Sequence, residues 1–254
     1  MGVVAVTGSA GGIGRAICER VAAEGQRVIG VDVRDADVIA DLGSAAGRDA
    51  AVAAIDDACG GVLDGLVVCA GLGGTVKPAS LVARVNYFGA VAMLDGLRPC
   101  LARGARPAAV AISSNSSTAV PPSDDGLVER FLDGDEDGAA AIADETDGEL
   151  VYARSKLALA RAVRRRAAEW GKEGIRLNAV APGPVLTPLT EAALQHPVSG
   201  PLIRAFPVPL ERWGEPSEIA DAVWFLLGPK GAWIHGVVLF VDGGTDALIR
   251  GDVF

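Results

Sequence analysis

Short apolar runs alternate with longer stretches of helical periodicity along the chain, and this alternation constrains the fold more than any other feature. The alternation is typical of an α/β fold, a doubly wound parallel seven-stranded sheet covered by helices on both faces. The predicted strands are Val3–Thr7, Arg27–Asp32, Asp37–Ala40, Gly65–Ala70, Ala108–Ser113, Arg176–Ala181 and Val237–Val241. The predicted helices are Gly12–Glu24, Ser44–Cys59, Ser80–Leu101, Tyr152–Gly171 and Pro216–Leu227.

Length and charge limit the number of domains and the partners. The 254 residues suit one domain, residues 1–254, and half of them are hydrophobic, as strands buried on both faces require. The net charge of −9 arises in one segment, since residues 124–149 hold eleven acidic residues and a single base, Arg130. The remainder is nearly neutral and offers no basic surface, so we expect no nucleic-acid partner.

Other functional classes are also disfavoured. No apolar run approaches the roughly 20 residues of a membrane-spanning helix, and the first residues do not resemble a signal peptide, so we expect no membrane association. The four cysteines are scattered without a CxxC pair, which favours reduced thiols in the cytoplasm. The two histidines do not lie in a metal-ligand spacing, so we expect no metal cofactor.

Two segments interrupt the alternation. Residues 121–150 form an acidic insertion in which two short amphipathic helices are expected, because apolar residues recur at helical spacing from Leu127 to Leu132. The insertion is interpreted either as a second wall of the substrate pocket or as a solvated decoration. Residues 186–213 are rich in proline and scattered apolar residues, and we expect a long irregular loop that serves as a substrate lid.

A glycine-rich turn follows the first predicted strand. Gly8, Gly12 and Gly14, with Ser9 and Ile13 between them, let the backbone turn sharply and approach a pyrophosphate at the start of a helix. This strand–turn–helix context favours a dinucleotide site of the Rossmann type over a merely structural turn. Because Gly14 is followed by Arg-Ala and not by Lys-Ser/Thr, a nucleotide-hydrolase phosphate loop is excluded.

Asp32 ends the second predicted strand, 18 residues after Gly14. A carboxylate at this position accepts hydrogen bonds from the ribose hydroxyls and repels a 2′-phosphate, which favours NAD over NADP. The nearby cation Arg34 could soften this preference. The alternative is a carboxylate that is merely solvated, an interpretation that suits Asp35 or Asp37 better.

These motifs resemble those of the short-chain dehydrogenase/reductase family, over essentially the whole chain. The Tyr-x-x-x-Lys signature is Tyr152 to Lys156, the serine motif is Ser113-Ser114, and Asn86 matches the helix asparagine. Cys69 replaces the usual asparagine of the Asn-Ala-Gly motif, and this puts in doubt only a strand-stabilising role. The resemblance implies a cofactor site formed by Gly8, Ser9, Gly12, Ile13, Gly14, Asp32, Asp41, Leu42, Cys69, Ala70, Gly71, Tyr152, Lys156, Pro182, Gly183, Val185 and Thr187.

The reacting centre is also reasonable on chemical grounds. Tyr152 and Lys156 lie one helical turn apart, and an ammonium about 4 Å from a phenol would lower the phenol pKa by roughly three, toward the working pH. Tyr152 would then exchange a proton with the substrate oxygen while Ser114 holds that oxygen. Asn86 would position a water beside Lys156, or its side chain simply satisfies backbone groups. A serine hydrolase is disfavoured because the chain has no Gly-x-Ser-x-Gly motif.

The substrate class follows from a narrower resemblance. The segments 32–36, 85–90 and 242–247, and the 37 residues between Ser114 and Tyr152, resemble the bacterial 3α-hydroxysteroid dehydrogenase/carbonyl reductases. The resemblance implies a small hydrophobic alcohol or ketone as substrate. Aromatic or terpenoid alcohol dehydrogenases and a cofactor-binding regulatory protein without turnover stay open. We expect a homo-oligomer, a dimer rather than a tetramer, because the insertion precedes a helix that many relatives use for subunit contact.

Overall fold

A computed structural model describes residues 2–119, 126–197 and 199–253. Within these ranges the sequence forms one seven-stranded sheet in the order β3-β2-β1-β4-β5-β6-β7, and every neighbouring pair is parallel. The predicted doubly wound parallel sheet is therefore confirmed. The strands are β1 Val3–Thr7, β2 Arg27–Asp32, β3 Val38–Ile39, β4 Gly65–Val68, β5 Ala108–Ile112, β6 Arg176–Pro182 and β7 Val238–Val241.

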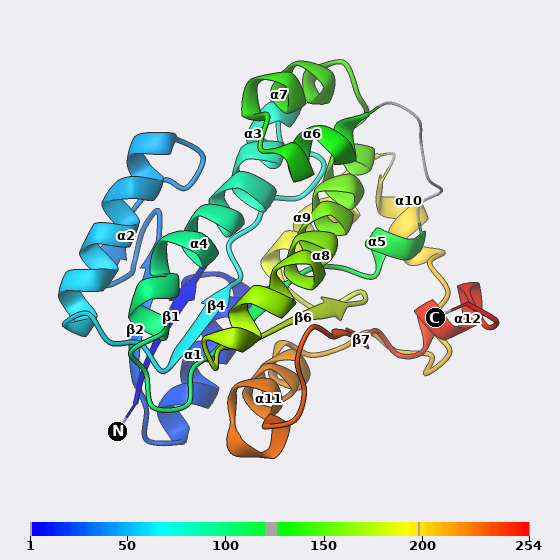
Figure 1. Cartoon of the computed structure of the whole chain (residues 1–254). Coiled ribbons are helices and arrows are strands. Elements are labelled where there is room, and N and C mark those ends of the chain that lie inside the picture. The colour runs from blue at the N-terminus through cyan, green and yellow to red at the C-terminus, as the bar shows by residue number, and fades with distance from the viewer. Residues whose placement is uncertain (1, 120–125, 198, 254) are drawn as a thin grey trace.

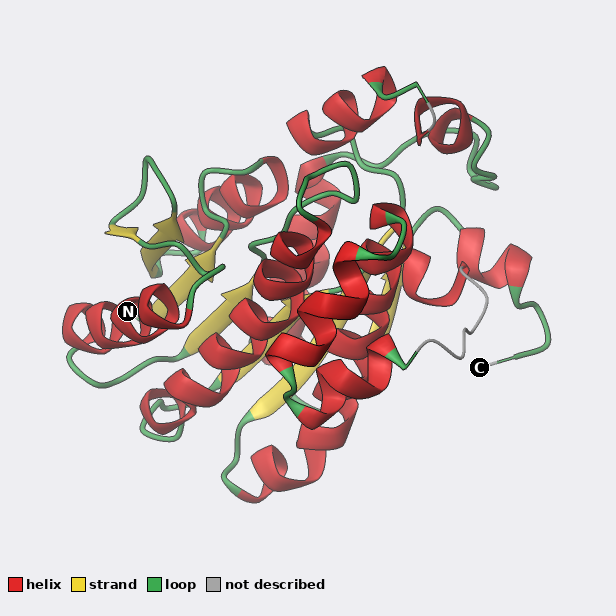
Figure 2. Ribbon diagram, turned by 90° about the horizontal axis from the view of Figure 1, so that it is seen from above, coloured by secondary structure: helices red, strands yellow, loops and turns green. Residues whose placement is uncertain are grey.

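Helices cover both faces of this sheet (Figures 1 and 2). Helices α2 (Ala45–Cys59), α4 (Ala90–Leu101) and α8 (Gly148–Lys172) pack on one face around a core that includes Ile55, Leu94 and Trp170. Helices α1 (Gly12–Ala23) and α11 (Pro216–Leu227) pack on the other. The short η2 (Pro229–Gly231) and α12 (Thr245–Ile249) flank β7. Among the described residues, no helix combines the length and apolarity that a membrane span requires.

The predicted single helix over residues 80–101 has three parts. It begins as α3 (Ala79–Ala83), widens into the π-helical turn η1 (Arg84–Gly89) and continues as α4. Apolar periodicity does not distinguish a π turn from an α-helix, so this turn could not be predicted from the residue pattern. Such turns are common at functional sites, and this one contains Asn86.

The described part of the acidic insertion is packed against the domain. Its helices are α6 (Leu127–Asp133) and α7 (Glu136–Asp144), which follow the short α5 (Ser116–Ala119), and Leu127 and Phe131 are fully buried. Two short amphipathic helices were expected here and are present, whereas the interpretation as a solvated decoration is wrong for this part. Residues 121–125 of the predicted insertion lie outside the described residues.

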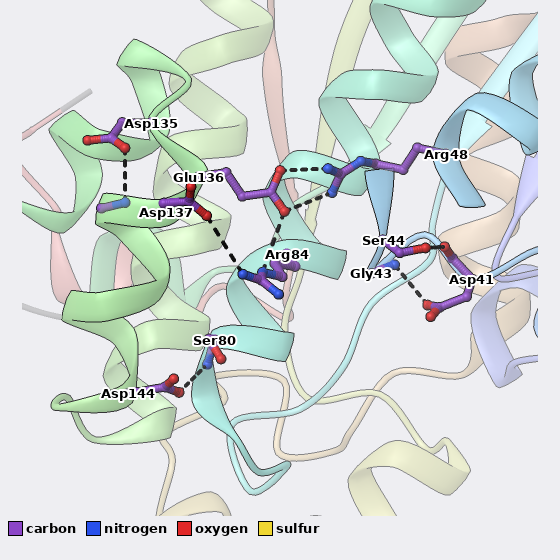
Figure 3. A network of polar contacts seen from close by, with 11 residues as sticks. Asp41, Gly43, Ser44, Arg48, Ser80, Arg84, Asp135, Glu136, Asp137 and Asp144 are labelled. Carbon is purple, nitrogen blue, oxygen red and sulfur yellow. Dashed lines mark hydrogen bonds and ion pairs between the residues drawn. The ribbon is translucent and has the colours of Figure 1, made fainter. Parts of the chain in front are cut away.

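Ion pairs attach α7 to neighbouring helices (Figure 3). The Glu136 carboxylate accepts hydrogen bonds from Nη1 and Nη2 of Arg48 on α2, at 3.3 and 2.6 Å, and it also pairs with Arg84 Nε at 3.5 Å. At the other end of α7, Asp144 accepts a hydrogen bond of 2.9 Å from the backbone N–H of Ser80 in α3. The insertion is thus joined to α2, α3 and η1.

The segment 186–213 contains two helices where an irregular loop was predicted. These are α9 (Pro188–Gln195) and α10 (Ser199–Arg204). Thr187 caps α9 by accepting the N–H of Thr190, and Pro188 occupies the first helical position, where its missing N–H is not needed. The predicted helix Tyr152–Gly171 also differs, because α8 begins at Gly148 after the capping residue Asp147 and not at Tyr152.

Candidate active site

Most of the predicted site residues lie at or just beyond the carboxyl ends of strands β1 to β6, and the others lie on α1, η1 and α8. The strand order reverses between β1 and β4, and in open α/β sheets ligands bind at such a switch point. The ends of these two strands are tied together, because Thr7 Oγ1 accepts the backbone N–H groups of Cys69 at 3.0 Å and Ala70 at 3.1 Å.

The glycine turn is packed so closely that Gly8 and Gly14 cannot be replaced by residues with a side chain. Gly8 has a φ of 69°, and a Cβ on Gly14 would lie 2.0 Å from the Gly8 carbonyl oxygen. The first N–H groups of α1 have no partner within the helix and carry the positive end of its dipole. Ser9 Oγ is buried without a hydrogen-bond partner among the described residues. The free N–H groups at the start of α1 and the unpaired Ser9 hydroxyl are suited to bind the phosphate groups of a dinucleotide.

Asp32 is bound to the glycine turn. Its Oδ2 accepts the backbone N–H of Ala10 at 3.0 Å, and its Oδ1 accepts that of Val33 at 2.7 Å. A carboxylate has about four lone-pair positions, so each oxygen can accept a further hydrogen bond. The side chain is half-buried at the end of β2 and is thus not the freely solvated carboxylate of the alternative interpretation.

Asp41 and Leu42 face different surroundings. The exposed Asp41 carboxylate accepts the N–H of Gly43 at 2.9 Å in the turn before α2 (Figure 3), whereas Leu42 is buried in the core. An adenine-contacting role for Asp41 and Leu42 stays a prediction.

Burial raises the pKa of the Cys69 thiol to about 12, so this side chain stays protonated near neutral pH.

The loop after β6 meets the glycine turn. A Cβ on Gly12 would lie 2.9 Å from Cγ2 of Thr187, so these two predicted cofactor residues are in contact. Gly183 donates its N–H to the Val241 carbonyl oxygen at 3.1 Å, which fixes the loop that begins at Pro182 against β7. Val185 is buried behind it. The structure therefore brings the first and last parts of the predicted cofactor site together.

Tyr152 and Lys156 lie on one side of α8. Lys156 is 4% exposed, and its Nζ lies 5.9 Å from the Tyr152 ring centroid and donates to the Ile112 carbonyl oxygen at 2.9 Å. Burial lowers the pKa of Lys156 to about 8. Burial also raises the pKa of Tyr152 above its ordinary value, and a hydrogen bond with Ser114 only partly opposes this. The expected lowering of the phenol pKa is therefore wrong for this structure, because burial dominates and the pKa of Tyr152 is raised.

Ser114 lies beside the Tyr152 phenol. Its Oγ accepts hydrogen bonds from the backbone N–H of Ser116 at 3.2 Å and from the Ser116 hydroxyl at 3.0 Å. Because Ser114 Oγ accepts these two hydrogen bonds, its own hydroxyl proton is available to donate to the phenol or to a substrate oxygen. The preceding residue, Ser113, donates to the Lys156 backbone carbonyl at 2.9 Å and ties the end of β5 to α8.

Asn86 is fully buried and close to Lys156. Its Oδ1 accepts the N–H of Leu72 at 2.7 Å, and its Nδ2 donates to the Leu72 carbonyl at 2.9 Å. A Cβ on Gly71 would lie 3.3 Å from Lys156 Nζ and 3.4 Å from Asn86 Oδ1, so the two side chains flank this glycine. The Asn86 amide thus satisfies backbone groups, and the water relay stays a prediction.

Two polar residues beside the reacting centre, Glu149 and Ser199, were not predicted from the sequence. Glu149 lies three residues before Tyr152 on α8, and its charge contributes to raising the pKa of the phenol. Its Oε1 accepts a hydrogen bond of 2.7 Å from the hydroxyl of Ser199, which is buried on α10. The spacing of Glu149 from Tyr152 could have indicated a shared helix face, but no local pattern points to Ser199.

Comparisons with known proteins agree with this geometry. The family model described as short chain dehydrogenase matches residues 2–123, and the model described as Enoyl-(Acyl carrier protein) reductase matches residues 139–246. The 3-alpha-hydroxysteroid dehydrogenase/carbonyl reductase of Comamonas testosteroni is 45% identical, over 98% of each chain. The galactitol 2-dehydrogenase (L-tagatose-forming) of Cereibacter sphaeroides is 32% identical, over 94% of this chain and 93% of that protein.

A solved structure is also closely similar. The 3-alpha-hydroxysteroid dehydrogenase from Pseudomonas sp. B-0831, complexed with NADH, superposes with a TM-score of 0.97 and is 50% identical, over 99% of this chain and 100% of that chain. Sequence, fold and arrangement of the site lead to the same assignment. The chain belongs to the short-chain dehydrogenase/reductase family of oxidoreductases.

Proposed function

We propose that this protein is an NAD(H)-dependent 3α-hydroxysteroid dehydrogenase/carbonyl reductase that interconverts a secondary alcohol and a ketone. The observation that carries the proposal is the cluster of Ser114, Tyr152 and Lys156 beside a glycine turn shaped for a dinucleotide. The relatives from Comamonas and Pseudomonas support the substrate class.

The chain's own groups suit proton transfer to a ketone. Because the pKa of Tyr152 is raised, the phenol is protonated near neutral pH and can act as the general acid toward the carbonyl oxygen. Ser114 donates a hydrogen bond to the same oxygen and stabilises the charge that develops there. Lys156 holds its ammonium beneath the phenol ring through the Ile112 carbonyl. A nicotinamide cofactor, when bound, would supply the hydride for the carbonyl carbon or accept it in alcohol oxidation.

The cofactor site has the features that NAD requires. The turn from Gly8 to Gly14 would hold the pyrophosphate at the start of α1, and the remaining lone pairs of Asp32 would accept the ribose hydroxyls. The Asp32 charge disfavours a 2′-phosphate, although the exposed Arg34 is near it in sequence. The Pseudomonas relative, solved with NADH, supports this preference.

Residues 186–213 would form a lid over a bulky apolar substrate. Leu189 on α9 is exposed and faces the loop after β4, since a Cβ on Gly73 would lie 3.3 Å from its Cδ1. An apolar side chain that is exposed at the mouth of the site is free to bury against a substrate, and such burial contributes about 25 cal/mol per Å².

A homodimer is the proposed assembly. Among the described residues β7 is an edge strand of the sheet, Trp233 is 99% accessible, and helices α6 and α7 of the insertion pack against α8 and α3. Light scattering should give the mass of two chains, and the mass of four would contradict the proposal.

The proposed compartment is a reducing one such as the cytoplasm, and the four free thiols support this.

A substrate panel tests the proposed function. Steroids, aromatic and terpenoid alcohols and small ketones would each be supplied with NAD(H) and with NADP(H), and the absorbance of the reduced nicotinamide would be followed. The highest kcat/KM is expected for a 3α-hydroxysteroid or 3-ketosteroid with NAD(H). A clear preference for aromatic or terpenoid alcohols would contradict the substrate class, and binding of NADH without turnover of any compound would favour a regulatory protein.

A further inference from the structure

Two cysteines and a carboxylate converge between α2 and α4, away from the proposed active site. Asp56 Oδ1, Cys59 Sγ and Cys100 Sγ all lie within 4.8 Å of one another. Asp56 and Cys59 are three residues apart on α2 and therefore share one face of that helix, and Cys100 comes from α4. Because the two cysteines are 41 positions apart in the sequence, no spacing motif indicates this cluster.

The helices approach closely enough to share a ligand. A Cβ on Gly96 of α4 would lie 2.7 Å from Cγ2 of Val52 on α2, so only glycine permits this packing distance. A groove of about 610 Å³ beside the cluster is lined by Asp56 and Cys100 and leads to the surface. The cluster thus combines a fixed set of donors with an entry path, which a metal site requires.

Hydrogen bonds and an ion pair fix the side chains of the cluster in position. Cys100 Sγ donates to Asp56 Oδ1 at 2.9 Å, and Cys59 Sγ donates to the Asp56 backbone carbonyl at 3.4 Å. Arg103 Nη2 lies 3.6 Å from Asp56 Oδ1 and 3.7 Å from Cys100 Sγ, while its Nε donates to the Gly61 carbonyl at 2.6 Å. The guanidinium is therefore anchored beside two of the three donor atoms.

We propose that Asp56, Cys59 and Cys100 bind a thiophilic divalent metal ion, zinc in particular, which joins α2 to α4. Two sulfur donors and one carboxylate oxygen leave the fourth position of a tetrahedral zinc ion for a water from the groove. On binding, each thiol releases its proton to solvent and forms one sulfur–zinc bond, with no change of oxidation state. Two thiolates and a carboxylate exceed the ion's charge by one, and Arg103 supplies the balancing positive charge and an outer hydrogen bond.

The proposed metal site is distant from the reaction chemistry. The backbone carbonyl of Cys100 accepts the N–H of Leu63, just before β4, which places the cluster at the amino ends of the strands. The site described above lies at their carboxyl ends, so the two proposals can fail independently.

Metal titration of the reduced full-length protein tests this inference. Zinc bound after equilibrium dialysis should reach one ion per chain, and cadmium as a probe should produce an ultraviolet thiolate-to-metal charge-transfer band. Cys59→Ser should weaken binding at least tenfold and remove much of the band, and Asp56→Asn should weaken binding less. Cys100→Ser should act like Cys59→Ser, but Cys59 is only half-buried, so its variant is the safer one for folding.

Two other cysteines provide the controls. Cys18→Ser and Cys69→Ser should leave the stoichiometry and the charge-transfer band unchanged, because neither thiol belongs to the cluster. The proposal is overturned if reduced protein binds no zinc in dialysis, or if Cys59→Ser binds zinc and cadmium as tightly as the unaltered chain does.

Discussion

The Nζ atom of Lys156 lies 5.9 Å from the ring centroid of Tyr152 and is held there by a 2.9 Å hydrogen bond to the Ile112 carbonyl. The lysine is thus fixed under the phenol by the end of β5. Burial then acts on both groups, lowering the pKa of the ammonium and raising that of the phenol. Both shifts disfavour the charged forms, so this pair favours a neutral phenol, which suits carbonyl reduction.

Replacement of Tyr152 by Phe removes the proposed proton donor and little else. We expect kcat to fall by about 10²- to 10⁴-fold, the usual contribution of a positioned acid or base, with NADH affinity within about twofold. Steady-state kinetics and fluorescence titration with NADH measure the two effects.

Tyr87 is the matched control, because it is the only other tyrosine of the chain. It is buried among the rings of Phe88 and Phe131, and Tyr87→Phe should keep most of the activity. Unchanged turnover in Tyr152→Phe, or an equal loss in both variants, would refute the assigned role.

The burial of Lys156 predicts a specific dependence of stability on pH. The folded chain releases the Lys156 proton near pH 8, whereas a lysine in the unfolded chain keeps its proton up to its ordinary pKa of 10.5. Between these values the unfolded state binds more protons, so the free energy of unfolding rises with pH. Relative to Lys156→Met, the unaltered chain should gain roughly 3 kcal/mol from pH 8 to 10.5.

Urea denaturation at a series of pH values measures this gain. Below pH 8 lysine is charged in both states, and the difference between the two proteins should be constant. Lys172, whose side chain is 71% exposed, provides the control, and Lys172→Met should run parallel to the unaltered chain. Parallel curves for Lys156→Met as well would show that the buried ammonium is not destabilised.

Much of the fold could be predicted because its strands are buried on both faces and leave continuous apolar runs. The site residues could be placed because they sit at strand ends and on one helix face. The helices of residues 186–213 escaped prediction because prolines are frequent in this segment and α9 buries no residue in the core. The contacts Lys156–Ile112 and Glu149–Ser199 join residues 44 and 50 positions apart, and no local pattern encodes them.

The hydrogen bond between Ser199 and Glu149 should hold the proposed lid against the catalytic helix. Ser199→Ala removes a hydrogen bond to a charged group, worth about 1.5–3 kcal/mol, part of which holds the lid closed. We expect the substrate KM to rise about 3- to 10-fold, a smaller change in kcat and unaltered NADH affinity.

Glu191→Gln is the control for this variant, because Glu191 is exposed on α9 of the same segment. Its KM should match that of the unaltered chain. Weaker NADH binding in Ser199→Ala, or no change in its KM, would argue against a lid contact.

The ion pair between Glu136 and Arg48 should account for much of the attachment of the insertion (Figure 3). The Arg48 side chain is only 8% exposed and that of Glu136 27%, so Glu136→Gln leaves a nearly buried guanidinium without its main counter-charge. We expect a loss of about 1–3 kcal/mol in the free energy of unfolding. The adjacent Asp137 is fully exposed and 4.0 Å from Arg84, so Asp137→Asn should leave the free energy of unfolding nearly unchanged. Chemical denaturation of the two variants side by side distinguishes a docked insertion from a solvated one, for which both changes would have equally small effects.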